Sequence, residues 1–505
     1  MNRRRDAYGL ITKRCDILYS FKNFKKGGKT VKRILFISLA VVLGLSMGLI
    51  GCGGEELPPE GPEVIMLGTC RDTDEGMQDF ECYHGGPYMR YWVNKVNDEE
   101  GGIYLSEYAE TVPLELVVRE FSVATWDIGT VVQGLIDDGA AMILGGPSTD
   151  TVYTLAPVCN ANGVILMSLE GGASMMVWEH EDFIDDWPYV WVNLSFANWY
   201  EIPVLKGMMD EMVTDRDPIA YVTYIGGPGA EHGLEYKQTT IDEFGAGNVL
   251  PAGGIEHAFF MTQEEANTII QGAIDALGDP NDPNYDIFCG YTYPWNCAAL
   301  FIAAQTYGFN PPAMIFGPGT SQGYWEVTWG DLIEGLCSFG TANYETTVKV
   351  GTPTMSMADL YDGIGAQIED DWANYDPPCS NYYGGTSGTD LLDFWGQPIF
   401  EAGLEMWKTA VEEVGDLDNT AIRDVMASFS ESNPCTTVFG DTWYRVFGNG
   451  YGGGIVDYMC MTGQIGQWQS GIFEITGYDG INNNLPNYDV TADFMFPMTD
   501  KWNWL

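Results

Sequence analysis

Side chains that could hold a small molecule gather where the predicted strands of this chain end. Hydroxyl groups and backbone N–H groups can bind a carboxylate there, an arginine can pair with one, and a glutamate can receive an ammonium group. Aromatic faces can cover an apolar or cationic group, and packing in the core is the equal alternative for these rings. The chemistry is that of binding, and the residues concerned are Arg71, Ser148, Thr149, Ser168, Glu170, Gly171, Tyr291, Tyr293, Trp295 and Thr320.

The sequence offers little support for catalysis or for a metal site. Adjacent carboxylates such as Asp137 and Asp138 are expected by chance among 71 acidic residues, and glycoside hydrolysis needs two carboxyl groups about 5 to 10 Å apart across a groove. No Gly-x-Ser-x-Gly motif has a suitable histidine beside it, and the four histidines are scattered. The turns at 145–147 and 226–228 complete no nucleotide-binding motif. We expect no enzyme activity, no metal and no cofactor.

Residues 31–52 have the pattern of an export signal. Lys32 and Arg33 precede an apolar run from Ile34 to Leu45, which is shorter than the about 20 residues of a membrane-spanning helix. The stretch Leu49-Ile50-Gly51-Cys52 resembles the lipobox of bacterial lipoproteins, in which the cysteine is acylated and becomes the new N-terminus. The alternative is an ordinary cleaved signal with an unrelated cysteine. We expect a lipid anchor at Cys52 and a flexible tether over residues 52–62.

The mature part of the chain would be strongly acidic. The formal net charge is −48, and the residues after 51 keep 12 basic and 69 acidic side chains. Such a surface repels nucleic acid, which we exclude as a partner. Apolar residues at 45% and aromatic residues at 13% still supply the cores of two or three compact units.

Nine cysteines follow Cys52. Because an export signal implies an oxidising compartment, the close pairs Cys70/Cys82 and Cys289/Cys297 are disulfide candidates. The odd number leaves at least one thiol unpaired within the chain.

From Glu63 onward, short apolar strands alternate with longer amphipathic segments, which predicts an α/β fold with parallel sheets. The alternation restarts after Tyr200, so we expect two such units. Ligands of parallel sheets bind beyond the carboxyl ends of the strands, and two facing sets of loops predict a cleft. The expected strands are 64–68, 113–118, 141–144, 164–167, 219–224, 287–289 and 313–316, and the expected helices are 87–97, 126–137, 153–161, 232–244, 262–277, 298–307, 395–414 and 419–428. Short paired strands are expected over 437–477.

The order of these segments resembles the type I periplasmic binding fold, specifically the substrate-binding lipoproteins of branched-chain amino-acid ABC transporters. The stretches that carry the resemblance include WVNKVNDEEGGI (92–103), LIDDGAAMILGGPSTDTVYTLAPVCNANGVILMS (135–168), YVTYIGGPGAEHGLEY (221–236), DIFCGYTYPWNCAALFIAAQTYGF (286–309) and GQWQSGIFEITG (466–477). The family implies two lobes joined by three crossings, near Asn193, Phe339 and Val438. Lobe 1 would comprise residues 63–195 and 337–438, and lobe 2 residues 196–336 and 439–505.

The resemblance also suggests which side chains bind. Ser148 or Thr149 matches the family position whose hydroxyl and backbone N–H hold a carboxylate, and Ser168 opens the matching second loop. The family's next hydroxyl falls in the segment Glu170-Gly171-Gly172, and its aromatic at the start of a lobe 2 helix falls at Ala230. The loops therefore depart from those that bind an ordinary α-amino acid.

The function expected from these features is that of an exported, membrane-anchored lipoprotein facing the periplasm or the cell exterior. It would be a monomer that captures a small polar ligand, an amino acid or amide-like molecule, and delivers it to an ABC permease. The alternatives are a ligand-sensing surface receptor without a transporter and a glycan-binding module.

Residues 1–30 precede any normal signal and carry nine of the 23 basic residues. We expect translation to start at Val31 from a GTG codon, so that residues 1–51 are an upstream extension followed by a signal peptide. The nucleotide sequence checks this: a ribosome-binding site just before codon 31 is the expected result, and one just before codon 1 would contradict it.

Overall fold

A computed structural model of the chain describes residues 59–72, 85–122, 125–145, 149–168, 187–193, 197–212, 217–227, 231–277, 287–374, 387–446, 453–457, 459–461, 463–477 and 488–496. Residues 1–59 and 60–505 fall into two separate units, and the second carries every element discussed below. The expected anchor Cys52, most of its tether and the upstream extension lie outside the described residues.

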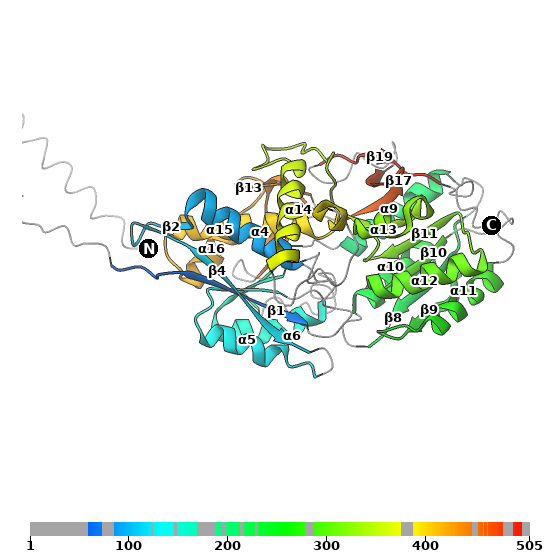
Figure 1. The fold of residues 1–505 in the computed structure, drawn as a ribbon, viewed down its shortest axis with the longest axis horizontal. Coiled ribbons are helices and arrows are strands. Elements are labelled where there is room, and N and C mark those ends of the chain that lie inside the picture. The colour runs from blue at the N-terminus through cyan, green and yellow to red at the C-terminus, as the bar shows by residue number, and fades with distance from the viewer. Residues whose placement is uncertain are drawn as a thin grey trace, which may run out of the picture. The chain divides into compact units, whose positions relative to one another are not determined.

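The first sheet has seven strands among the described residues (Figure 1). Its central strands are parallel, and β15 at one end pairs antiparallel with β16. Every residue of β5 and β6 is buried, as expected for strands covered on both faces. In spatial order the strands are β15 (Tyr444–Val446), β16 (Gly454–Val456), β7 (Val190–Val192), β6 (Ile165–Ser168), β5 (Met142–Leu144), β1 (Ile65–Asp72) and β4 (Leu114–Phe121).

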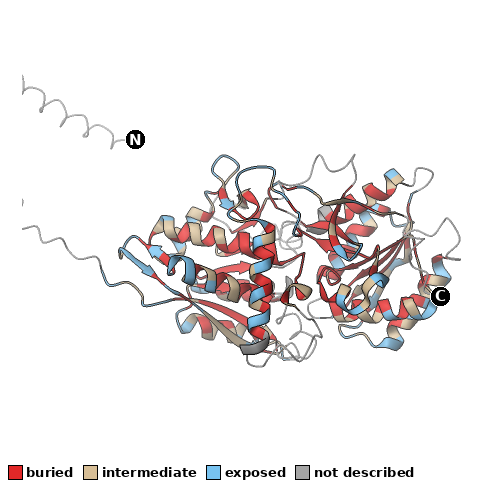
Figure 2. Cartoon of the chain, turned by 45° about the horizontal axis from the view of Figure 1, so that its top comes forward, coloured by how far each residue is buried: buried red, intermediate tan, exposed pale blue. Residues whose placement is uncertain are grey.

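Side chains that alternate along these strands pack into two cores. Met142 and Leu144 of β5 lie in the core formed with α4 (Gly85–Glu100) and α15 (Gln397–Val414), whereas Ile143 lies in the core formed with α5 (Ile128–Asp137) and α6 (Thr149–Asn162). Successive side chains along a strand point to opposite faces of the sheet. Helices therefore cover both faces of the first sheet, and Figure 2 shows their buried sides as stripes.

The second sheet has eight strands in the part of the chain that the structure describes. Five of them are parallel, and the hairpin β17–β18 adds to β12 in the antiparallel sense. Helix α9 (Ala197–Met212) packs with α10 (Glu231–Phe244), and α11 (Gln263–Leu277) packs with α12 (Pro294–Tyr307). The strands in order are β19 (Ala492–Asp493), β18 (Ile472–Gly477), β17 (Gln464–Gln469), β12 (Cys337–Gly340), β11 (Ala313–Gly317), β10 (Ile287–Tyr291), β8 (Ala220–Ile225) and β9 (Val249–His257).

The remaining elements extend the two layered units. They are the ribbons β2 (Ile103–Leu105) with β3 (Glu110–Val112) and β13 (Cys435–Thr437) with β14 (Gly440–Thr442), the helices α13 (Tyr324–Trp329), α14 (Met357–Asn374) and α16 (Asn419–Met426), and the 3-10 turns η2 (Gly330–Ile333) and η4 (Gly388–Leu391).

Sheet membership differs from the lobe boundaries expected from the sequence. Strand β12 belongs to the second sheet, because it is parallel to β11 and antiparallel to β17, although residues 337–438 were expected in lobe 1. Strands β15 and β16 join the first sheet next to β7, although residues 439–505 were expected in lobe 2. We call the unit around the first sheet the first lobe, and the unit around the second sheet the second lobe.

A fully buried carboxyl lies close to where the chain first enters the second lobe. Glu201 of α9 accepts a hydrogen bond from the hydroxyl of Tyr236 at 2.6 Å, and the ring of Tyr236 stacks on Phe339 with centroids 4.1 Å apart. Burial raises the pKa of Glu201 well above its ordinary value, and hydrogen bonds from Tyr236 and Trp395 oppose this only in part. Burial therefore favours the neutral, protonated form of Glu201 in the folded chain.

Helix α15 approaches the end of β7 so closely that only glycine fits between them. A Cβ atom at Gly403 would overlap the amide of Asn193, whose Oδ1 accepts a hydrogen bond from Tyr444 at 2.9 Å. We expect Gly403→Ala to lower the free energy of unfolding by about 1 to 3 kcal/mol, the usual cost of overpacking. Chemical denaturation measures it, with Gly247→Ala as control because a Cβ there meets nothing within 4 Å. Equal stability of the two variants would contradict this packing.

The protonated state of Glu201 predicts a pH dependence of stability. As pH rises above 4.5, the unfolded chain releases this proton while the folded chain keeps it, so the stability that Glu201 contributes is lost as pH rises. We expect Glu201→Gln to remove this component, up to about 1.4 kcal/mol per pH unit. Denaturation between about pH 5 and 8 measures the slope, with the exposed Glu243→Gln as the matched control. Identical slopes for both variants and the parent would refute the assignment.

Candidate functional site

The carboxyl ends of the two sets of parallel strands are brought toward each other. Helix α6 follows β5 of the first sheet, helix α10 follows β8 of the second, and the two helices are in contact. Both helices begin at the carboxyl edge of their sheet, where open α/β sheets bind ligands. The candidate site therefore lies at the facing strand ends.

On the first lobe the described part of this edge is polar and buried. Asp72 ends β1, Ser168 ends β6 and Asn193 follows β7, each at most 3% exposed. Thr149 begins α6, but its side chain lies outside what the structure describes, as do the predicted site residues Ser148, Glu170 and Gly171. Their contact with a ligand stays a prediction.

Arg71 is engaged in an ion pair. Its Nη2 lies 2.6 Å from Oε1 of Glu120, and the Arg71 side chain is 13% exposed. The pair forms because strands β1 and β4 are in parallel register, with Arg71 opposite Glu120. A ligand carboxylate at this position would have to compete with Glu120 for the guanidinium group.

The structure places Tyr291 and Thr320 in the core of the second lobe, and their contact with a ligand stays a prediction. Tyr291 is fully buried, stacks on Tyr236 with centroids 5.5 Å apart, and shares a hydrogen bond with Thr240. Burial raises the pKa of the Tyr291 hydroxyl well above its ordinary value. Thr320 is also fully buried and donates its hydroxyl to the carbonyl of Phe316 at 3.0 Å. Both side chains hold the fold together.

Two predicted aromatic residues do lie together at the carboxyl edge of the second sheet. Tyr293 and Trp295 stack with centroids 4.9 Å apart, and Trp295 also contacts the rings of Phe259 at 5.8 Å and Phe260 at 5.6 Å. The ring of His232, on α10, lies 4.6 Å from that of Tyr293. We call these five residues the aromatic wall.

Hydrogen bonds fix the two loops that carry the aromatic wall. Trp295 Nε1 and Asn296 Nδ2 both donate to the carbonyl of Phe259 at 3.0 Å, and the backbone N–H of Met261 donates to Asn296 Oδ1 at 2.8 Å. The loop after β9 is thereby joined to the loop after β10. Phe260 remains 50% exposed. The wall is thus a fixed cluster in which Tyr293 and His232 are buried, Phe259 and Trp295 are half-buried and Phe260 is exposed.

A neutral imidazole ends the strand that leads to the aromatic wall. His257, at the end of β9, is buried and shares a hydrogen bond of 2.8 Å with the hydroxyl of Thr223. Burial, with a smaller effect of His232, lowers the pKa of His257 to about 3, so its imidazole is uncharged at neutral pH. Such a surface suits an apolar, aromatic or cationic group.

The predicted disulfide between Cys289 and Cys297 is wrong. Both are free, fully buried thiols: Cys289 lies within β10, and Cys297 donates to the carbonyl of Thr292 at 3.4 Å from the first turn of α12. Burial raises the pKa of Cys289 to about 12, so its thiol stays protonated. Cys82 lies outside the described residues, and its pairing with the buried Cys70 stays a prediction.

Three members of the aromatic wall, His232, Phe259 and Phe260, were missed in the sequence analysis. Strand β9, which leads to the two phenylalanines, contains Pro251, Gly253 and Gly254. These residues are more typical of a loop than of a strand. The signal that could have found them is the adjacent aromatic pair just after a possible strand, at the same edge as Tyr293.

The described residues lack both a metal-binding cluster and a membrane-spanning helix. They contain no group of three or more histidine, cysteine or carboxylate side chains arranged to hold a metal ion. No helix in the same part of the chain is long and apolar enough to span a bilayer.

Known structures resemble this chain over most of its length. LivJ from Streptococcus pneumoniae, a branched-chain amino acid transporter substrate-binding protein in complex with isoleucine, has a TM-score of 0.55 and 12% identity over 85% of this chain and 99% of that chain. The leucine-binding protein LivK from Thermotoga maritima has a TM-score of 0.55 and 10% identity, over 85% of this chain and 98% of that chain. A solute-binding protein from R. palustris in complex with 4-hydroxybenzoate has a TM-score of 0.55 and 13% identity, over 86% of this chain and 98% of that chain.

No family model matches the sequence, and no curated protein does. At these sequence identities the structural likeness shows the fold alone. Two α/β lobes with parallel-dominated sheets, and agreement over nearly the full length of LivJ and LivK, show that this chain has the type I periplasmic binding fold.

Proposed function

We propose that this chain is an extracytoplasmic solute-binding protein that captures a small molecule between its two lobes and delivers it to an ABC permease. The observation that carries the proposal is the pair of parallel sheets whose carboxyl ends face each other across the α6–α10 contact. The likeness to LivJ in complex with isoleucine and to a protein in complex with 4-hydroxybenzoate supports it. Binding is the whole activity, and no bond is made or broken.

The aromatic wall favours a ligand with a flat or apolar part. The half-buried ring of Trp295 is already held in place by the buried Tyr293 and by its own hydrogen bond, so little ordering entropy is lost on binding. The polar edge of the first lobe, with Ser168 and the expected loop at 148–149, would hold the polar end of the same molecule. An aromatic or branched amino acid, an amide or a hydroxybenzoate combines these two halves.

Ligand binding would close the lobes by a population shift. A ligand that contacts both sets of strand ends only when the lobes are shut has a higher affinity for the closed form, and draws the equilibrium toward it. The crossings that act as hinges would be those near Asn193, after β12 and before β17, because the chain changes sheet there. The first lobe would then hold about 60–193 and 357–456, and the second 197–340 and 464–496.

The setting of this function would be the outer side of a membrane. We propose that Cys52 carries a lipid anchor, that residues 53–62 form the tether, and that the protein acts as a monomer beside its permease. The acidic composition supports an exported protein that stays soluble and separate at a membrane surface.

Trp295 provides the test of the ligand site. A thermal-shift screen with amino acids, amides, polyamines and small aromatic acids should yield a ligand that, at 100 times its dissociation constant, adds about 2.7 kcal/mol of stability. For that ligand we expect Trp295→Ala to weaken binding about tenfold or more by calorimetry, since a buried ring contact is lost. Tyr307→Ala, an exposed aromatic on α12, is the matched control. Unchanged affinity in Trp295→Ala would remove the aromatic wall from the site.

Lobe closure has its own measurement. The same ligand should reduce the radius of gyration in small-angle scattering, because closing the hinge brings the lobes together. A ligand that binds at Trp295 without changing the scattering curve would contradict the closing mechanism and would favour a rigid binding module.

Lipid attachment is checked by expressing the full-length chain in a bacterial host with labelled palmitate. We expect label in the parent chain and none in Cys52→Ser, because the thiol is the acylated group. Cys379→Ser, which removes a cysteine far from the signal, is the control and should be labelled like the parent. Label that persists in Cys52→Ser would contradict the anchor.

A further inference from the structure

A short segment just before α15 joins the first lobe to the second through hydrogen bonds. This segment, residues 392–396, follows the turn η4 directly and leads into α15, and we call it the strap. Every residue of the strap is buried. The strap is therefore part of the interior of the molecule, although it lies between two units that are otherwise separate in their sheets.

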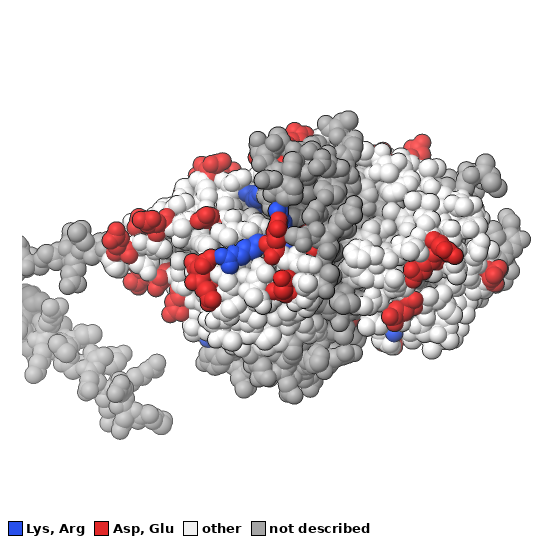
Figure 3. Space-filling model, turned by 60° about the horizontal axis from the view of Figure 1, so that its bottom comes forward, with Lys and Arg blue, Asp and Glu red and all other residues white. Residues whose placement is uncertain are grey.

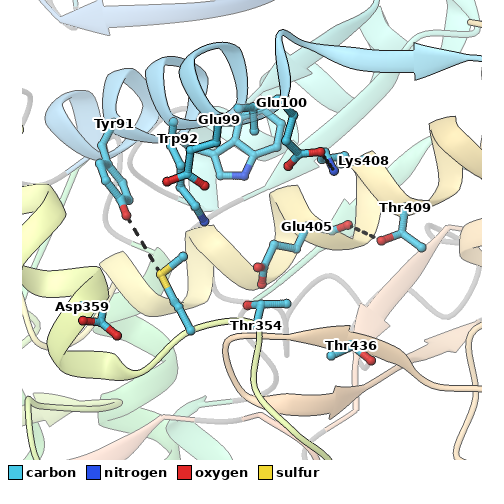
Figure 4. A pocket seen from close by; sticks show the side chains of 13 residues that line it. Tyr91, Trp92, Glu99, Glu100, Thr354, Asp359, Glu405, Lys408, Thr409 and Thr436 are labelled. Carbon is cyan, nitrogen blue, oxygen red and sulfur yellow. Dashed lines mark hydrogen bonds and ion pairs between the residues drawn. The ribbon is translucent and has the colours of Figure 1, made fainter. Parts of the chain in front are cut away.

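One end of the strap is fixed to the first lobe, because it continues into α15. Figure 4 shows α15 lying alongside α4 around a pocket, with Lys408 of α15 beside Glu100 of α4. Lys408 Nζ lies 2.8 Å from Oε2 of Glu100, and Lys95 Nζ of α4 lies 2.9 Å from Oε1 of the buried Glu401 of α15. A movement of the first lobe therefore carries α15 and this end of the strap with it.

The strap pairs with the loop that follows β11 of the second lobe. Gln322 and Asp393 form an antiparallel bridge, and the backbone N–H of Gly323 donates to the carbonyl of Leu392 at 2.8 Å. Such a bridge is one rung of an antiparallel sheet. The backbone of one lobe is thus hydrogen-bonded directly to that of the other.

The side chain of Asp393 strengthens this pairing. The residue is fully buried, and its Oδ1 accepts the hydroxyl of Ser321 at 2.7 Å and the backbone N–H of Trp395 at 3.1 Å. Its Oδ2 accepts the backbone N–H of Gly396 at 3.4 Å. N–H groups at the beginning of a helix attract negative charge, so the start of α15 stabilises the carboxylate. Asp393 therefore links α15 of the first lobe to Ser321 of the second.

The strap also pairs with the hinge crossing that follows β12. The backbone N–H of Thr341 donates to the carbonyl of Phe394 at 2.8 Å, and the hydroxyl of Thr341 donates to the carbonyl of Trp395 at 2.6 Å. The ring of Phe394 stacks on Phe473 of β18 at 5.8 Å and meets Tyr361 of α14 at 5.3 Å. The strap thus lies beside a crossing about which the lobes would turn.

Ion pairs between described residues lie within the lobes rather than across them. The exception is Lys349 with Asp489, in which Lys349 belongs to the segment 341–356 between the lobes. Figure 3 shows acidic side chains on both lobes and far fewer basic ones. Because like charges repel, this distribution does not draw the lobes together. Hydrogen bonds such as those of the strap must hold them.

We propose that Ser321, Thr341 and Asp393 are positioning residues for ligand capture: through them the strap holds the lobes in their present arrangement and limits how readily they move apart. This role rests on the proposed function, because lobe movement is the motion by which the ligand would be enclosed. Covalent crossings alone permit a wide range of lobe angles. The strap adds a non-covalent connection beside them and so narrows that range.

Double electron–electron resonance tests this role in the free protein, without a ligand. Spin labels on a non-canonical amino acid replace the exposed Asp137 of α5 and Glu243 of α10, so that the native cysteines stay unlabelled. We expect Thr341→Val to shift the equilibrium from the parent distance toward other distances about fivefold, the equivalent of one hydrogen bond of about 1 kcal/mol. Ser321→Ala should act in the same way, because Asp393 keeps its bonds to α15 but loses its bond to the second lobe.

Thr476→Val is the matched control. The hydroxyl of Thr476 is also buried and donates to a backbone carbonyl, that of Ile465 at 2.8 Å, but both residues lie in the second lobe. Thermal denaturation of each variant shows that it is folded and measures the cost of the lost bond. A bond with a merely structural role would lower the melting temperature in Thr341→Val and Thr476→Val alike and leave the distance between the lobes unchanged.

Two results would overturn the proposal. One is a distance distribution in Thr341→Val and Ser321→Ala equal to that of the parent. The other is an equal shift in all three variants, since the strap would then matter no more than any buried hydrogen bond. A failed ligand screen at Trp295 leaves the distances as they are, and a ligand that binds while the distances stay unchanged in these variants removes the strap alone.

Discussion

The parallel pairing of β1, β4, β5, β6 and β7, and of β8 to β12, is the constraint on which this molecule depends. Parallel neighbours cannot be joined by a tight turn, so each connection crosses the sheet as a helix or long loop and covers one of its faces. The loops that follow the strands then share one edge in each sheet. Contact between α6 and α10 brings those two edges toward each other, which is why binding groups from distant parts of the sequence can serve one molecule.

Much of this architecture could be predicted because the apolar strands and amphipathic helices alternate clearly. The helices expected at 87–97, 232–244 and 262–277 correspond to α4, α10 and α11, and the strands expected at 141–144 and 313–316 correspond to β5 and β11. The helix α9 was missed because Pro203 interrupts its pattern, and β9 because of its proline and glycines. Which sheet β12, β15 and β16 join depends on pairing between residues far apart in the sequence, and the local sequence pattern does not predict such pairing.

The candidate site could be predicted only in outline. Loop positions located Tyr293 and Trp295, since residues just beyond a buried strand lie at its carboxyl edge. The sequence does not show which way the side chain of Tyr291 points. Tyr291 is the last residue of β10, and its ring points into the core beside Tyr236. The sequence also does not show which residue pairs with Arg71. Its ion pair with Glu120 depends on the register of two strands, and the two residues are 49 positions apart in sequence. The contact between α4 and α15 joins Lys95 to Glu401, 306 positions away in the sequence, which no local motif predicts.

The buried thiols bear on how this protein can be made. Cys289, Cys297, Cys337, Cys435 and Cys460 are all free and buried, and burial raises the pKa of each thiol above its ordinary value. A protonated thiol without solvent access neither attacks a disulfide nor reacts readily with oxidants. Once folded, these five positions tolerate reducing and oxidising surroundings alike, so mild reductants during purification leave the cores around them intact.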